Sequence, residues 1–165
     1  TEELYITDGG LETTLVFLKG MELPCFAAFP LLDSTEGCNI LKEYYRCYLN
    51  IAAEYHSRFI LESPTWRANP DWIEKLGHNQ TYMAEVNTKA IELMMELKNE
   101  YQSKIPNIII SGCIGPRGDG YVSANEMQPD AAAEYHAKQI QTPNSKVTQR
   151  VAFCPWLEIL KDVKP

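Results

Sequence analysis

The sequence predicts an α/β protein built on a parallel sheet, either doubly wound or closed as a barrel. Segments with the pattern of a β-strand alternate with segments whose apolar residues recur at helical spacing. Each predicted strand ends in a polar or glycine-rich loop and is followed by a helix, the order found in βαβ units. The strand expected at 107–111 has an all-isoleucine centre, as in a strand covered on both faces. In either arrangement, ligands bind beyond the carboxyl ends of the strands.

The first predicted unit is a short strand at 4–7 and a helix over about 11–19. Asp8, Gly9 and Gly10 stand between them. Two interpretations of Asp8 are open: it presents a carboxylate from the strand end, or it caps the helix, since Asp is a favoured cap residue. The glycines let the chain turn sharply or let a ligand approach closely.

The second predicted unit begins with a proline-containing loop over 21–33. Its centre, residues 25–29, is too apolar to lie idle in solvent, so we expect it to cover another part of the molecule. Apolar and aromatic residues at helical spacing predict one long amphipathic helix over 35–55. The second strand is expected at 58–62, followed by a loop over 63–70 that is rich in hydrogen-bonding groups and stiffened by two prolines.

Two helices are then expected, near 70–76 and near 80–102, and the methionines of the longer one are assigned to the core. The third strand, 107–111, leads into a glycine-rich loop at 112–120, and a further helix is expected at 129–141. The loop matches neither the P-loop pattern nor the dinucleotide-binding fingerprint. A nucleotide site is therefore weakly supported.

Composition and charge exclude several classes of partner. The length of 165 residues and an apolar content of 45% suit one domain with a sizeable core. A formal net charge of −7, without a cluster of Lys or Arg, argues against nucleic acid and against an anionic membrane. The apolar runs are far shorter than a bilayer span, and the first residues lack the pattern of a signal peptide. We expect a cytoplasmic protein.

The cysteines and histidines give no local signal for a metal. The five cysteines stand at wide, irregular spacings without a Cys-x-x-Cys pair, which predicts reduced thiols. The three histidines are scattered and make no pattern of metal ligands.

Three segments together resemble the homocysteine S-methyltransferase family. They follow the three predicted strands and read DGGLET at 8–13, ESPTWRAN at 62–69 and SGCIGPRGD at 111–119. The family patterns there are roughly D-G-G/A-x-x-T, T-N-T-[YF]-x-A and G-[SC]-[IL]-G-P-x-G. No single motif is specific, but the three in this order and spacing are. The resemblance covers about residues 4–141. We therefore expect an N-terminal barrel part at 1–141 and a tail at 142–165 that does not match the family.

The resemblance implies a TIM (β/α)8 barrel, of which this chain carries the first three or four βα units, a partial barrel. It also implies transfer of a methyl group from a sulfonium or ammonium donor to the thiol of homocysteine, giving methionine. In that family, zinc held by cysteines binds the homocysteine sulfur as a thiolate. A metal-bound thiol is deprotonated at neutral pH, whereas a free thiol is mostly protonated.

On the same resemblance, four residues bind the substrate. Asp8 holds the ammonium group of homocysteine, Gly9 gives the chain room, and Thr65 and Trp66 line the pocket. Trp66 or Phe29 could also shield the positive centre of the donor by a cation–π contact, with plain packing as the alternative for Trp66. Catalytic residues are not assigned, and the donor stays open between betaine, S-methylmethionine and S-adenosylmethionine.

The sequence also departs from the family. The family's zinc ligands lie in Gly-Gly-x-Cys and Gly-Gly-Cys-Cys motifs of later strands, and this chain has neither. Cys113 is not at a ligand position of the family, so zinc is expected for the family but not for this chain as given. A full barrel needs roughly 250 residues, and half a barrel leaves open sheet edges.

Two functions of different classes follow. The chain is a homocysteine S-methyltransferase homologue that supplies the amino-acid-binding half of the site, or it is a truncated, zinc-less half-barrel that self-associates as a homo-oligomer without catalysis. A shortened gene product, a missing middle segment or a trimmed dimer would each explain the tail, in which 151–163 could form an amphipathic helix over apolar surface. A third possibility is a different barrel enzyme that uses Asp8 and Glu62 as an acid/base pair.

Overall fold

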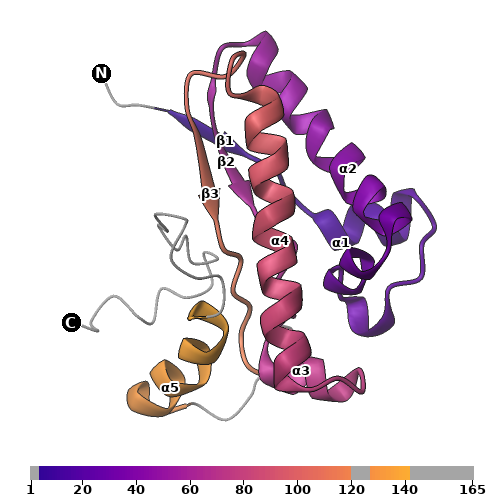
Figure 1. The fold of residues 1–165 in the computed structure, drawn as a ribbon, viewed down its shortest axis with the longest axis vertical. Coiled ribbons are helices and arrows are strands. Elements are labelled where there is room, and N and C mark those ends of the chain that lie inside the picture. Colours follow the sequence, from indigo (N-terminus) through magenta and orange to yellow (C-terminus); the bar gives the residue numbers. More distant parts are fainter. Residues whose placement is uncertain (1–3, 120–126, 142–165) are drawn as a thin grey trace.

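The computed structural model describes residues 4–119 and 127–141, and within them three parallel strands form one sheet (Figure 1). The strands are β1 (Tyr5–Thr7), β2 (Arg58–Glu62) and β3 (Ile108–Ser111), in the order β1-β2-β3. In the register, Thr7 lies beside Ile60, and Glu62 lies beside Ser111. The carboxyl ends of all three strands therefore meet at one edge of the sheet. The predicted parallel sheet is confirmed, with each strand within one residue of its expected bounds.

The helices follow the predicted order. They are α1 (Leu11–Thr13), which continues as a π-helical segment over Thr14–Leu18, then α2 (Thr35–Glu54), α3 (Pro70–Lys75), α4 (Gln80–Tyr101) and α5 (Pro129–Ile140). Side-chain caps fix where the longer ones begin. The Ser34 hydroxyl accepts a hydrogen bond from the Gly37 amide at 3.0 Å at the start of α2, and Asn79 accepts one from the Tyr82 amide at 2.9 Å at the start of α4. In the described part of the chain, no helix is long and apolar enough to cross a membrane.

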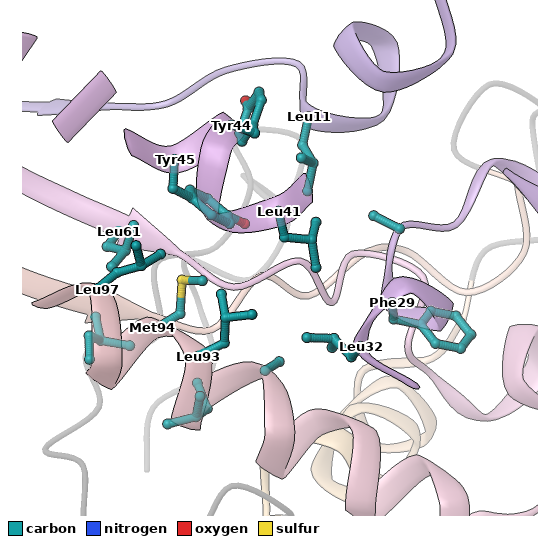
Figure 2. Close-up of a cluster of buried hydrophobic side chains, with 14 of the residues drawn as sticks. Leu11, Phe29, Leu32, Leu41, Tyr44, Tyr45, Leu61, Leu93, Met94 and Leu97 are labelled. Atoms are coloured by element: carbon teal, nitrogen blue, oxygen red, sulfur yellow. The ribbon is translucent and has the colours of Figure 1, made fainter. Parts of the chain in front are cut away.

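The core lies where α2 and α4 pack against each other and against one face of the sheet (Figure 1). Phe59 and Leu61 of β2 are fully buried, while the alternate residues of that strand are half-buried. Figure 2 shows side chains from several elements gathered here, including Leu41 and Tyr45 of α2, Leu61 of β2, and Met94 and Leu97 of α4. The core role predicted for the α4 methionines holds for Met83 and Met94. In β3, Ile109 is half-buried, so the prediction of burial on both faces holds only in part.

The segment over 21–33 is more ordered than a loop. It forms two 3₁₀ helices, Pro24–Phe26 and Phe29–Asp33, and buries Ala27, Ala28 and Phe29 in the core. Cys25 and Phe26 both have left-handed backbone angles, with φ of 54° and 55°. Such angles are unfavourable for residues with a side chain, so contacts elsewhere must hold them. The helix predicted at 151–163 lies outside the described residues.

Candidate functional site

Acidic side chains gather at the carboxyl edge of the sheet. Asp8 follows β1, Glu62 ends β2 and Glu12 lies in α1. Burial raises the pKa of Glu62, and the charge of Asp8 raises it further. Burial also raises the pKa of Glu12; the guanidinium of Arg67 opposes this shift, and the charge of Asp8 adds to it. Asp8 therefore lies close enough to both glutamates to affect their pKa values, and all three carboxyl groups are partly shielded from water.

Only one of the two carboxylate oxygens of Asp8 is hydrogen-bonded within the described residues. Its Oδ2 accepts a hydrogen bond from the Tyr44 hydroxyl at 3.0 Å, whereas Oδ1 is buried without a hydrogen-bond partner among the described residues. Burial raises the pKa of Asp8, and the Tyr44 hydroxyl partly offsets that rise. The cap position of α1 is occupied by Gly10, with no side-chain cap. The capping interpretation of Asp8 is therefore wrong, because Tyr44 engages the carboxylate instead.

The two glycines shape the chain beside Asp8. Gly10 has a φ of 67°, which makes the sharp turn into α1. A Cβ added at Gly9 would meet nothing within 4 Å, so the chain is not crowded at this residue. The Gly9 carbonyl accepts a hydrogen bond from the Tyr48 hydroxyl at 3.0 Å and lies 2.9 Å from the Tyr44 hydroxyl. Both tyrosines belong to α2, one helical turn apart.

Thr65 joins the loops that follow β2 and β3. Its hydroxyl lies 2.7 Å from that of Ser63 and donates to the carbonyl of Cys113 at 2.8 Å, while the Cys113 amide donates to Ser63 at 3.0 Å. Gln139 of α5 donates to the Thr65 carbonyl at 2.9 Å. Thr65 is buried, and these bonds use its hydroxyl to fasten two strand-end loops together. Its predicted contact with substrate stays a prediction.

Trp66 is half-buried and lies against Arg67, whose Cζ is 4.7 Å from the centre of the Trp66 ring. The same guanidinium lies 4.0 Å from the ring of Trp72 in α3. The Trp66 ring therefore already has a cationic partner from the protein, and the prediction that it faces a donor cation stays untested. Phe29 cannot take that role: it is fully buried in the core and packs against Tyr82 with ring centres 6.3 Å apart.

Arg67 connects four segments. Besides the two indole rings, its Nη1 donates to the Cys25 carbonyl at 2.6 Å, and its Nη2 lies 3.5 Å from Asp119. The residue is 7% exposed. A charge buried this deeply needs such partners. Arg67 therefore holds together the segment after α1, the loop after β2, helix α3 and the loop after β3.

The described residues do not form a thiolate zinc site. Across residues 4–119 and 127–141, no three side chains of His, Cys, Asp or Glu are placed to hold a metal ion together. Cys113 is half-buried, and the four cysteines of the described part are free thiols, as predicted. The chemistry available here is that of carboxylates, which suit a small cation such as an ammonium group.

Sequence reasoning missed Tyr44, Tyr48 and Arg67. The two tyrosines stand four residues apart on α2, within the apolar and aromatic pattern that predicts the helix, and that pattern does not show that their hydroxyls bind polar groups. Arg67 stands inside the ESPTWRAN motif, between Trp66 and a buried alanine, and that position was the available signal for a buried cation.

Comparisons with known proteins agree with the fold and the motifs. The family model for homocysteine S-methyltransferase matches residues 5–159, past the position near 141 at which the resemblance was expected to end. The crystal structure of the oxidised form of the homocysteine methyltransferase MmuM from Escherichia coli is similar, with a TM-score of 0.66 and 16% identity over 86% of this chain and 49% of that chain. The metallated form gives a TM-score of 0.64 and 16% identity over 86% of this chain and 50% of that one.

The chain therefore spans about half the length of these two structures. A comparison with curated proteins finds no match. The family match covers most of the chain, and the parallel sheet places the three motifs together at its carboxyl edge. The chain belongs to the homocysteine S-methyltransferase family.

Proposed function

We propose that this chain carries the homocysteine-binding part of a homocysteine S-methyltransferase, which moves a methyl group from a sulfonium or ammonium donor to the homocysteine thiol in methionine biosynthesis. The observation that carries the proposal is Asp8, whose Oδ1 is buried without a hydrogen-bond partner among the described residues, at the carboxyl edge of the sheet. An unpaired buried carboxylate oxygen is costly, and an ammonium group would satisfy it.

The chemistry assigned to this chain is binding and orientation. Asp8 would hold the ammonium group, and the neighbouring carboxylates Glu12 and Glu62 would strengthen the attraction for a cation. The uncrowded chain at Gly9 would leave room for the amino-acid backbone. Because the described residues do not form a thiolate zinc site, activation of the thiol is not assigned to them.

The wider proposal concerns the whole fold and the compartment. We infer that the described sheet is the first part of a TIM (β/α)8 barrel, with the site at the edge where barrel enzymes bind their ligands. The free thiols of the four described cysteines support the cytoplasm as the compartment.

The proposal is tested by calorimetric titration of the full chain with L-homocysteine in a reducing buffer. The matched ligand is γ-mercaptobutyrate, which is homocysteine without its amino group. We expect homocysteine to bind at least about tenfold more tightly, and Asp8→Asn to remove that difference. The control variant is Glu96→Gln, which changes an exposed acid paired with Lys42 on the outer surface of α4. Equal affinity of the unaltered chain for both ligands would contradict the proposal.

One observation favours the alternative of a truncated, zinc-less half-barrel that self-associates without catalysis. Phe17 and Leu18, in the π-helical segment after α1, are 72% and 81% exposed. Apolar side chains this exposed suit an interface between copies. A stable dimer by light scattering, with no binding of homocysteine, would favour this alternative over the methyltransferase.

A further inference from the structure

Asp8 and the Gly9 carbonyl share the hydroxyl of Tyr44. That hydroxyl lies 3.0 Å from Asp8 Oδ2 and 2.9 Å from the Gly9 oxygen, but it has a single proton to donate. The Tyr48 hydroxyl donates to the same Gly9 carbonyl at 3.0 Å. Because Tyr48 already satisfies the carbonyl, the proton of Tyr44 is available to the carboxylate.

The Tyr44 ring is fixed by its neighbours. It is 3% exposed and packs against Tyr45 and Tyr48, with ring centres 5.2 Å apart in both pairs. Because the ring is fixed, the Tyr44 hydroxyl stays in one position and restrains the orientation of the Asp8 carboxylate to which it donates. The oxygen it leaves is Oδ1, which is buried without a partner among the described residues.

We propose that Tyr44 is the positioning residue of this site: it fastens Oδ2 of Asp8 and thereby presents Oδ1 to the ammonium group of the ligand. This inference rests on the proposed function for the ligand, but its geometry is that of the protein alone. The carboxylate is then aimed before the ligand arrives, and less rotational freedom is lost on binding.

Tyr44 also affects the charge of Asp8. The titratable groups that face Asp8 are Glu12 from α1, Glu62 at the end of β2, and Tyr44 and Tyr45 from α2. Burial raises the pKa of Asp8, and the hydroxyl of Tyr44 is the side-chain group that most opposes this rise. With two acids beside it, Asp8 needs this donor to stay ionised and attract a cation.

The test compares Tyr44→Phe with Tyr48→Phe. Each removes one hydroxyl that contacts the Gly9 carbonyl and keeps the ring, but the first also removes the bond to Asp8. The titration midpoint of the Asp8 carboxyl carbon is measured by NMR without ligand, with the resonance assigned by its loss in Asp8→Asn. We expect Tyr44→Phe to raise the midpoint by roughly one pH unit. Tyr48→Phe should raise it less, because the Tyr44 hydroxyl is kept but is then shared with the Gly9 carbonyl.

Binding of homocysteine is the second readout. Tyr44→Phe should weaken it roughly tenfold at neutral pH and more at acid pH, where the variant protonates Asp8 earlier, whereas a purely structural role would not move this pH dependence. An unchanged Asp8 midpoint in Tyr44→Phe would overturn the inference. If the unaltered chain binds no homocysteine, the proposed function fails, but the midpoint still decides the role of Tyr44.

If Tyr44→Phe does not fold, the Asp8 titration midpoint cannot be measured in it. A second experiment therefore keeps all tyrosine side chains and changes only the strength of their hydroxyls as donors. Incorporation of meta-fluorinated tyrosine makes each phenol a stronger donor. The expected result is a lower midpoint for Asp8, and a midpoint that stays fixed or rises would contradict the inference.

Discussion

Replacing Arg67 by methionine should destabilise the protein far more than replacing an exposed arginine. Methionine keeps much of the length and apolar volume of the side chain but removes the guanidinium. That group donates to the Cys25 carbonyl at 2.6 Å, lies 3.5 Å from Asp119, and lies over the rings of Trp66 and Trp72. The substitution therefore releases four segments from one another.

The magnitude follows from these contacts. The hydrogen bond from a charged donor to the Cys25 carbonyl contributes about 2 kcal/mol, and the two cation–π contacts contribute about 1 kcal/mol each. Relief from burying a charge offsets part of this sum. The expected loss in the free energy of unfolding is about 2 to 4 kcal/mol, a large share of the stability of a small domain.

Urea denaturation followed by circular dichroism measures this loss. The control is Arg46→Met, which breaks an exposed pair with Glu100 joined at 2.8 Å, and should cost less than about 1 kcal/mol. If the two variants lose the same stability, the reasoning about Arg67 is refuted. A loss confined to Arg67→Met supports it.

Two further predictions concern close packing and pH. Gly115→Ala should destabilise the protein by about 2 kcal/mol and lower its melting temperature accordingly, because the added Cβ would lie 2.2 Å from the Trp66 carbonyl oxygen. The control is Gly112→Ala, whose Cβ meets nothing within 4 Å and should have little effect; equal melting temperatures of the two variants would contradict this. The pKa of Asp8 is raised in the folded state, so its contribution to stability is full below its ordinary pKa and is lost as pH rises through the folded value. Denaturation at a series of pH values should show a shallower decline over that window in Asp8→Asn, and an unchanged slope would argue against a shifted pKa.

The strands and the long helices could be predicted because their signals are local. The strand at 58–62 has the predicted bounds, and the helix predicted at 35–55 is observed as Thr35–Glu54. In both, the period of apolar residues is present within the segment itself, and the helix is directly preceded by its capping residue, Ser34.

What could not be predicted depends on contacts between distant segments. Asp8 resembled a helix cap, but the group that engages it, Tyr44, comes from 36 residues further along the chain. Cys25 and Phe26 adopt left-handed angles that neither residue favours, where Arg67 holds the Cys25 carbonyl from the loop after β2. A pattern read along the chain contains the residue types but not these pairings.

The order β1-β2-β3 has a consequence for how the chain acquires its structure during synthesis. Each strand pairs with the strand that precedes it, so its template has already left the ribosome when it emerges. The long helices α2 and α4 depend on local contacts, so they can form before the next strand has been synthesised. The entropy cost of closing each connection rises only slowly with its length. The sheet can therefore grow one unit at a time on the nascent chain, with each new strand pairing with the open backbone edge of the strand before it.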